Sequence, residues 1–310
     1  MDSLSTRKIA AVVLAYNSSR DLRTCLEGLA AQRGVNLAII VVDNNSSNHE
    51  RVEQLQIARQ CLPSLVLSQG AAPTEVSPAE PVHVYHVNET NGGYSAGNNV
   101  GLRLAGQMAC EAALIVNPDM VLADADYVAT LDAALQSDPK AAIACSSISR
   151  LDGGEDNPMV ELSLRQELLL PISLCLRGLS PTGSPEVVQA GIVEVEKVSG
   201  CCFLIELAFI QAQGWFDESV FLYCEESILR AQVKRADRKM VMDSNLRALH
   251  AHVSSEKGAA VARVAHWSRS RAHYHRSYSG YSVFVRGLLA CSRAIYVLAF
   301  RVRALLVSNE

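Results

Sequence analysis

The chain has 310 residues, of which 49% are hydrophobic and 19% charged, a composition typical of an ordered globular protein. This length is enough for one large α/β domain or two modest ones, without a disulfide or metal to stabilise the core. Aromatic residues make up only 5%, which argues against an aromatic-lined groove for single-stranded nucleic acid. The nine cysteines show no CxxC or CxxH spacing, which favours buried free thiols in a reducing compartment over a zinc site.

Charge is distributed unevenly along the chain. The net charge of −4 combines +7 for residues 263–310, which hold eight arginines and one acid, with −11 for the remainder. This asymmetry indicates an anionic partner for the tail, either a membrane surface or nucleic acid. The first residues lack the layout of a secretory signal, so we expect a cytoplasmic protein.

Predicted strands and helices alternate through the first half of the chain. Buried strands are expected at residues 8–15, 37–42, 82–87, 112–116 and 141–145, and helices at 21–32, 50–61, 95–109 and 125–136, with Ser19 as a cap of the first helix. Residues 68–81 are expected to form a loop insertion. The alternation predicts an α/β fold with a mostly parallel central sheet and helices on both faces.

Polar residues follow four of these predicted strands. They are Tyr16 and Asn17, Asp43 to Asn45, residues 88–91, and Asn117 to Asp119. Ligands of such sheets bind at the carboxyl ends of the strands. We therefore expect these four segments to face one crevice.

The segment 91–99 (NGGYSAGNN) opens a predicted helix, where backbone amides can approach a phosphate or sugar. A tight strand-to-helix turn with an asparagine cap would use the same residues. The dinucleotide-binding pattern GxGxxG does not follow the first strand.

Several side chains have both a chemical and a structural interpretation. Asp119 follows a buried strand and suits a divalent cation, but it also suits a helix cap. Asp43 could accept from a base N–H or form an Asx turn. Glu225 and Glu226 follow an apolar segment, as a general base would, although acids are also common at solvated helix starts. His250 and His252 share a face of a predicted strand, where they could contact a metal or diphosphate or be structural.

Taken together, seven segments resemble the family 2 inverting glycosyltransferases, especially the rhamnosyltransferase-like members that build bacterial O-antigen and capsule polysaccharides. The matching stretches lie at residues 12–32, 39–48 (IIVVDNNSSN), 91–102 (NGGYSAGNNVGL), 116–120 (VNPDM), 198–205, 214–227 (GWFDESVFLYCEES) and 250–255 (HAHVSS). The set and its order carry the resemblance, because no single stretch is that specific.

The resemblance implies a GT-A fold, a nucleoside-diphosphate sugar donor (dTDP- or UDP-linked) and Mg²⁺ or Mn²⁺. The donor residues that it implies are Tyr16, Asn17, Asp43, Asn44, Asn91, Gly93, Asn98, Asn99 and Asn117. Among them, Asn17 and Asp43 match the residues that hold the nucleobase and ribose. Asp119 ends the stretch that matches the DxD motif, where the first Asp is Asn117, and it would bind the metal with His252.

The resemblance also implies the catalytic groups. Glu225 and Glu226 stand where the family commonly reads Glu-Asp, so Glu226 is expected to be the base. Two departures concern this half of the site: the base is one methylene longer than Asp, and Ile228 replaces an acid often found there. We expect the departing diphosphate to be stabilised by the metal and by the helix start at residues 93–95.

We expect a GT-A domain at residues 1–258, with a donor half at 1–120 and an acceptor half at 121–258, followed by a basic helical extension at 259–310. Arginines interrupt residues 283–307 too often for a comfortable bilayer span, and the layout matches an interfacial amphipathic helix. Such a helix would hold the enzyme at the inner face of the cytoplasmic membrane beside a lipid-linked acceptor. Packing on the domain or in a homodimer interface is the alternative.

The expected function is transfer of a sugar, with rhamnose from dTDP-rhamnose as the first candidate and UDP-hexoses next, to a saccharide or lipid-linked acceptor. One alternative is a sugar-phosphate nucleotidyltransferase, but the loop after the first strand reads AYNSSRD and lacks a GxGxR-like signal. The other is a non-catalytic nucleotide- or nucleic-acid-binding protein. The tail is apolar as well as basic, which favours lipid, and no nucleic-acid partner is expected.

Overall fold

The computed structural model describes residues 7–68, 82–173, 190–251 and 260–307. The strands are β1 (Lys8–Ala15), β2 (Asn36–Asp43), β3 (Leu65–Ser68), β4 (His83–Val87), β5 (Ala112–Val116), β6 (Met120–Val121), β7 (Ala141–Arg150), β8 (Ile192–Val195), β9 (Cys202–Glu206) and β10 (Lys239–His250). The helices are α1 (Ser19–Ala30), α2 (Asn48–Cys61), α3 (Gly93–Gln107), α4 (Tyr127–Gln136), α5 (Leu164–Leu168), α6 (Leu170–Ser173), α7 (Leu207–Ala212), α8 (Glu225–Arg235), α9 (Ala260–Ser277) and α10 (Val283–Val307).

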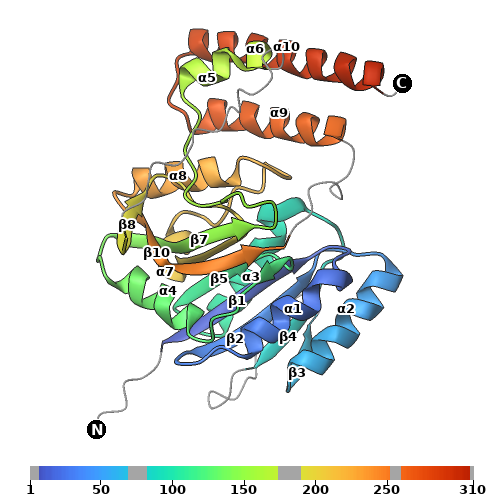
Figure 1. Ribbon diagram of the computed structural model, residues 1–310, viewed down its shortest axis with the longest axis vertical. Helices are drawn as coiled ribbons and strands as arrows, with labels where there is room; N and C mark the ends of the chain where they lie inside the picture. Colours follow the sequence, from blue (N-terminus) through green and yellow to red (C-terminus); the bar gives the residue numbers. More distant parts are fainter. Residues whose placement is uncertain (1–6, 69–81, 174–189, 252–259, 308–310) are drawn as a thin grey trace.

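The strands form one mixed sheet in the order β3-β4-β2-β1-β5-β9-β7-β10-β6, with β8 also paired to β10 (Figure 1). The pairs from β3 to β5 are parallel, and so is the β7–β10 pair. Strand β9 runs antiparallel between β5 and β7. The predicted α/β fold with a mostly parallel sheet is therefore confirmed.

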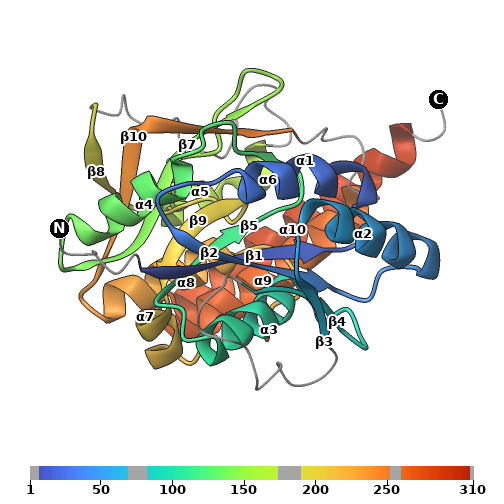
Figure 2. The same ribbon diagram turned by 90° about the horizontal axis from the view of Figure 1, so that it is seen from below.

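Apolar residues of β1 alternate between two cores, one on each face of the sheet. Ile9 and Val13 pack with α1, α2 and α4, whereas Ala10 and Val12 pack with α3, α7 and α8. Figure 2 shows these two groups of helices on opposite sides of the strands. Because both faces of the sheet are covered, the sequence of β1 is a continuous apolar run. A site that is open to solvent must therefore lie at an edge of the sheet.

Strand β10 brings two distant parts of the chain together. Its last residues, Leu249 and His250, pair with β6 directly after Asp119. The amide of Ala251 donates to the Asp119 carbonyl over 2.9 Å. His250 is thereby held beside Asp119 at the edge where β5 ends.

Helices α9 and α10 lie above the sheet domain, and α5 and α6 pack beside α10 (Figure 1). The Ser292 hydroxyl of α10 donates to the Glu167 carbonyl of α5 over 2.8 Å. Residues 283–304 of α10 are long and apolar enough to cross a membrane by length and composition alone, and an 18-residue window within them has a mean hydropathy of 1.7. The prediction that arginines make this segment unsuitable for a span is therefore not supported.

The predicted cap of the first helix differs from the structure. Ser18, not Ser19, precedes α1, and its side chain makes no capping hydrogen bond. Of the cysteines described, Cys291 is exposed and Cys61 is partly buried, while the other six are buried, all as free thiols.

Candidate functional site

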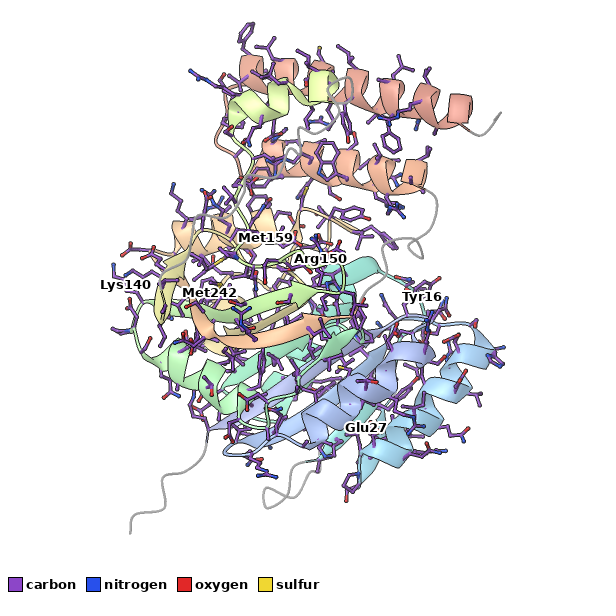
Figure 3. All side chains as sticks on the ribbon, viewed as in Figure 1. Tyr16, Glu27, Lys140, Arg150, Met159 and Met242 are labelled. Atoms are coloured by element: carbon purple, nitrogen blue, oxygen red, sulfur yellow. The ribbon has the colours of Figure 1, made fainter. Side chains whose placement is uncertain are left out.

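A cavity of about 680 Å³ opens at the carboxyl edge of β1, β2 and β5. Its walls come from the strand ends, from the start of α3 and from the segment before α8. The lining residues are Leu14, Tyr16, Asn17, Ser18, Asp21, Asn44, Asn91, Gly93, Tyr94, Asn117, Pro118, Asp119, Phe221 and Leu222. Tyr16 is seen at the end of β1 in Figure 3. We call this space the donor cavity, after the donor residues that the family resemblance implies.

The expected convergence of four polar segments is confirmed, since each contributes to the donor cavity. Tyr94, Phe221 and Leu222 complete the wall and were not singled out from the sequence. Tyr94 lies inside the NGGYSAGNN stretch, which was a usable signal. Phe221 and Leu222 lie more than 120 residues after Tyr94 in the sequence, so only the folded chain brings them to the cavity.

Asparagine side chains fasten the loop after β4 to the end of β2. The Asn44 amide nitrogen donates to Asn91 Oδ1 over 2.9 Å and to the Gly93 carbonyl over 3.1 Å. Its oxygen accepts from Asn88 Nδ2 over 3.0 Å. These bonds use both hydrogens of the buried Asn44 amide and one lone pair of its oxygen, so its part in the site includes positioning the loop.

Gly93 opens α3 in a left-handed conformation (φ +89), and a Cβ there would lie 2.1 Å from the Phe221 carbonyl oxygen. The Tyr94 amide donates to that same oxygen over 2.9 Å, and the Gly93 amide donates to Asn91 Oδ1 over 2.9 Å. These two amides are therefore already bound within the protein. If the helix start at residues 93–95 stabilises a departing diphosphate, as expected, it does so without these two amides, and this role stays a prediction.

Three expected donor residues do not line the cavity. Asp43 is fully buried and accepts from the Ser46 amide, Arg51 and the Tyr85 hydroxyl. Asn99 is also fully buried, and its amide nitrogen donates to the Phe216 carbonyl and to Glu218. Asn98 is buried as well and donates to the Tyr94 carbonyl. All three side chains hold the walls in place.

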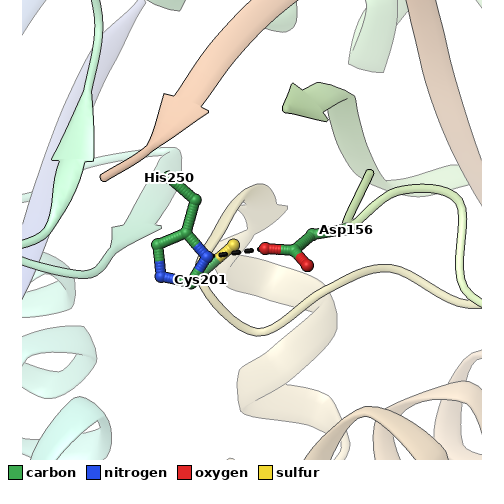
Figure 4. A group of neighbouring side chains, drawn as sticks. All are labelled: Asp156, Cys201 and His250. Carbon is green, nitrogen blue, oxygen red and sulfur yellow. Dashed lines mark hydrogen bonds and ion pairs between the residues drawn. The ribbon is translucent and has the colours of Figure 1, made fainter. Parts of the chain in front are cut away.

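Asp119 lines the donor cavity and is also part of a row of charged side chains with His250 and Asp156. His250 Nε2 is 3.3 Å from Asp119 Oδ2. On the other side of the ring, His250 Nδ1 is 2.6 Å from Asp156 Oδ2, the contact that Figure 4 shows. Burial disfavours the charged ring, but the hydrogen bonds to both carboxylates outweigh it and raise the pKa of His250 to about 9. His250 is thus a cation that bridges two carboxylates, whereas the expected ligand His252 lies outside the described residues.

Cys201 is the third member of this group, since its sulfur and the ligand atoms of Asp156 and His250 lie within 4.8 Å of one another. Figure 4 shows the three side chains together. Burial raises the pKa of the Cys201 thiol well above its ordinary value. The thiol is therefore protonated at neutral pH.

Glu225 and Glu226 begin α8, after two consecutive left-handed residues, Tyr223 (φ 71) and Cys224 (φ 67). Such strain in non-glycine residues often marks functional sites. Across this turn the lining changes, because Phe221 and Leu222 border the donor cavity while Tyr223, Cys224 and Glu226 border a second one. The turn is the wall between the two cavities.

The two carboxylates differ in environment. Glu225 is buried, and its Oε1 has no hydrogen-bond partner among the residues that the structure describes. Burial, together with the charge of Glu226, raises the pKa of Glu225 to about 8. A Cβ on Gly200 would lie 3.2 Å from Glu226 Oε1 and 3.3 Å from the Tyr94 hydroxyl oxygen. Glu226 is therefore close to Tyr94, which lines the donor cavity.

Comparison with known families decides what kind of protein this is. The model of glycosyl transferase family 2 matches residues 10–174, more than half of the chain. The chain belongs to this family. It is therefore a glycosyltransferase, which sets aside the nucleotidyltransferase and the non-catalytic alternatives. No curated protein matches the chain.

Solved glycosyltransferase structures share the GT-A fold with this chain. The mannosyltransferase PcManGT from Pyrobaculum calidifontis, in complex with GDP-Man and Mn²⁺, has a TM-score of 0.57 and 13% identity over 99% of this chain and 80% of its own. GalNAc-T7 with UDP, GalNAc and Mn²⁺ has a TM-score of 0.56 and 11% identity over 89% of this chain and 49% of its own. S. aureus TarS 1-349 with UDP-GlcNAc has a TM-score of 0.51 and 16% identity over 91% and 70%. At these identities the likeness concerns the fold alone.

Proposed function

We propose that this glycosyltransferase moves a sugar from a nucleoside-diphosphate sugar to an acceptor hydroxyl with inversion of the anomeric carbon. Glu226 removes the proton from the acceptor hydroxyl, and the oxygen forms a bond to the anomeric carbon. The bond from that carbon to the diphosphate oxygen breaks, and the nucleoside diphosphate leaves with the electron pair. The donor occupies the donor cavity, against Tyr16, Asn17 and Asn117.

The position of Glu226 is the observation that carries this proposal. It borders the second cavity, and it lies close to Tyr94 of the donor cavity. A base for in-line displacement must meet the acceptor on one side and the donor sugar on the other. Glu225 is less suited, because its raised pKa keeps it protonated at neutral pH.

Asp119 fits the divalent cation that the family resemblance implies. It lines the donor cavity, and a carboxylate oxygen is the ligand that Mg²⁺ and Mn²⁺ prefer. When bound, the ion would neutralise charge on the departing diphosphate. The structures with PcManGT and GalNAc-T7 both contain Mn²⁺, which supports this part of the proposal.

The proposed donor is dTDP-rhamnose, and the proposed context is bacterial O-antigen or capsule assembly at the inner face of the cytoplasmic membrane. The support is the match of Asn117-Pro118-Asp119 and of NGGYSAGNN to rhamnosyltransferase-like sequences. UDP-hexoses come second. The neighbouring structures hold UDP- or GDP-linked sugars, so the nucleotide is the first thing to test.

A thermal-shift panel of nucleotide sugars with Mg²⁺ or Mn²⁺ tests the proposal, because a bound ligand stabilises by about 2.7 kcal/mol at a hundredfold excess over Kd. We expect dTDP-rhamnose to give the largest shift, and Asp119→Ala to remove its dependence on the cation. In calorimetry, the donor affinity of Asp119→Ala should be the same with and without metal. The donor affinity of the unaltered protein should depend on the metal. Cation-independent binding in the unaltered protein would contradict the metal assignment, and no shift with any donor would contradict the function.

A further inference from the structure

The second cavity, of about 390 Å³, lies between the start of α8 and the helices α9 and α10. Its volume is within the usual range of ligand pockets. Most of its lining is apolar, including Met159, Leu162, Leu170, Trp267 and Tyr296. Glu226 borders the same space, so an acceptor bound in this cavity can bring its hydroxyl to the base.

The charged residues of this cavity are mostly committed to one another. Lys197 Nζ is 3.3 Å from Glu161 Oε2, and Arg271 pairs with both Glu161 and Glu167 at 2.5 Å. Arg263 also has an interaction partner. Glu226, by contrast, makes no hydrogen bond or ion pair with the part of the chain that the structure describes. The cavity thus offers one available carboxylate in largely apolar surroundings.

The apolar wall continues out of the cavity along α10. Trp267 and Tyr296 meet edge to face with ring centroids 5.7 Å apart, and Tyr296 is 6.4 Å from Phe300. Next to Tyr296, the side chains of Ile295 (56% exposed) and Leu298 (64% exposed) lie on the surface. An apolar chain that leaves the cavity past Tyr296 therefore meets more apolar surface.

We propose that the second cavity binds the apolar part of a lipid-linked acceptor, with the reacting hydroxyl at Glu226 and the chain directed past Trp267 and Tyr296 towards α10. The proposal rests on the proposed role of Glu226 as the base. A soluble oligosaccharide would leave most of its hydroxyls without partners on these walls, which is costly in a desolvated site. An amphiphile places its polar end at the carboxylate and buries its chain against the aromatic rings.

The test uses Trp267 as a reporter. Trp215→Phe leaves Trp267 as the single tryptophan of the chain, which has two. The probe is a maltoside with a dibrominated undecanoyl chain, used below its critical micelle concentration, because bromine quenches tryptophan emission on contact. We expect saturable quenching, and methyl maltoside should neither quench nor compete.

Two further substitutions in the Trp215→Phe background separate the cavity from the surface. Val264→Phe fills the cavity from α9, so it should weaken probe binding by about tenfold, equivalent to 1.4 kcal/mol. Val52→Ser alters only exposed surface of α2, away from the cavity and its exit, and should leave the quenching unchanged. Absence of quenching, or equal quenching with Val264→Phe, would overturn the proposal.

Donor binding is measured in parallel by calorimetry with nucleotide sugars. If the donor binds and the probe does not, the acceptor is a soluble saccharide and only this inference fails. If the probe binds and no donor does, the proposed function fails while the apolar site stands.

Discussion

Two adjacent carboxylates at the start of α8 illustrate how neighbours in sequence can differ in chemistry. Glu225 points into the protein and is 9% exposed, whereas Glu226 borders the second cavity. Successive residues of a helix face directions about 100° apart, so one of an adjacent pair is readily buried while the other meets a ligand. The assignment of the base therefore follows from the placement of α8.

Replacement of Glu226 by Gln should reduce transfer by about 10²- to 10⁴-fold, the usual contribution of a general base. Donor affinity should be unchanged, because the amide has the same shape and Glu226 does not line the donor cavity. Steady-state release of nucleoside diphosphate with acceptor present measures the loss. Near-normal transfer in Glu226→Gln together with an inactive Glu225→Gln would reverse the assignment.

Replacement of Glu225 by Gln should change how stability depends on pH. The pKa of Glu225 is about 8 in the folded chain and 4.5 as its ordinary value. Between these values the folded state holds a proton that the unfolded state has released, so stability from this group falls as pH rises. Glu225→Gln removes that loss and should gain stability over the unaltered protein between pH 5 and pH 8, by up to about 1.4 kcal/mol per pH unit. Urea unfolding at pH 5 and pH 8 measures the difference in stability between the variant and the unaltered protein. The control is Glu89→Gln at an exposed site, for which this difference should not change with pH.

Gly93→Ala should disrupt the donor cavity. The substitution meets the Phe221 carbonyl at 2.1 Å and imposes a side chain on a left-handed residue, so we expect destabilisation of more than about 1 kcal/mol. Gly106→Ala is a matched control in the same helix, because its Cβ meets nothing within 4 Å and alanine favours helix by up to about 1 kcal/mol. Thermal unfolding and donor affinity should both fall for the first variant only; equal behaviour of the two would contradict this geometry.

Much of the donor side of the site is predictable from residues alone. Tyr16, Asn17, Asn117 and Asp119 follow strands whose carboxyl ends must meet, so their convergence follows from the alternation of elements. The alternation of elements does not indicate which side chains of α3 face the cavity and which are buried in the protein. The sequence motif therefore included Asn99, which the fold buries as a structural residue.

At the scale of elements, a buried ion cluster attaches α9 to the rest of the chain. The guanidinium of Arg271 is 3% exposed and pairs with Glu161 and with Glu167 of α5, while it also donates to Ser227 of α8. His275 Nε2 is 2.7 Å from the same Glu167. These contacts join three helices around the second cavity.

Arg271→Ala should loosen this attachment, because it leaves the buried carboxylates of Glu161 and Glu167 with only Lys197 and His275 as their partners. Loss of one partner of a buried pair typically costs about 3–5 kcal/mol. Limited proteolysis should cut α9 and α10 faster, and the melting temperature should fall. The control is Arg276→Ala on the exposed side of the same helix, which should behave like the unaltered chain. Equal protease resistance of both variants would show that the cluster does not hold α9.

The ends of elements with a clear apolar pattern are predictable to within about three residues, as for β1, β5 and α10. Strand direction was less accessible, since an apolar run does not encode whether β9 runs parallel or antiparallel. The short strand β3 was also missed, because it adjoins a polar, proline-containing segment. Such features depend on pairing with strands far away in the sequence.

At the scale of the whole molecule, α10 presents apolar side chains to the surface, with Phe284 75% exposed and Leu298 64% exposed. Of its arginines, Arg286 and Arg293 contact α9, whereas Arg301 and Arg303 are exposed. The proposed donor cavity lies at the edge of the sheet, and the apolar helix α10 lies above the sheet domain (Figure 1). This arrangement would suit an enzyme whose acceptors are anchored in a membrane. The division at residue 258 stays a prediction, since α9 packs closely on the preceding domain.

Flotation with liposomes tests the membrane role of the extension. We expect the chain to float with vesicles that contain anionic lipid, and less so as salt rises, because each arginine near such a surface contributes about 1 kcal/mol. Phe284→Ser with Leu298→Ser should weaken partitioning about 100-fold, since each side chain loses at least 1.5 kcal/mol of burial. Val52→Ser, at a 67% exposed site on α2, is the matched control and should float normally. If the double variant and the unaltered chain partition equally, α10 is not the membrane contact, and a concentration-dependent dimer in sedimentation would then identify its apolar face as a subunit interface.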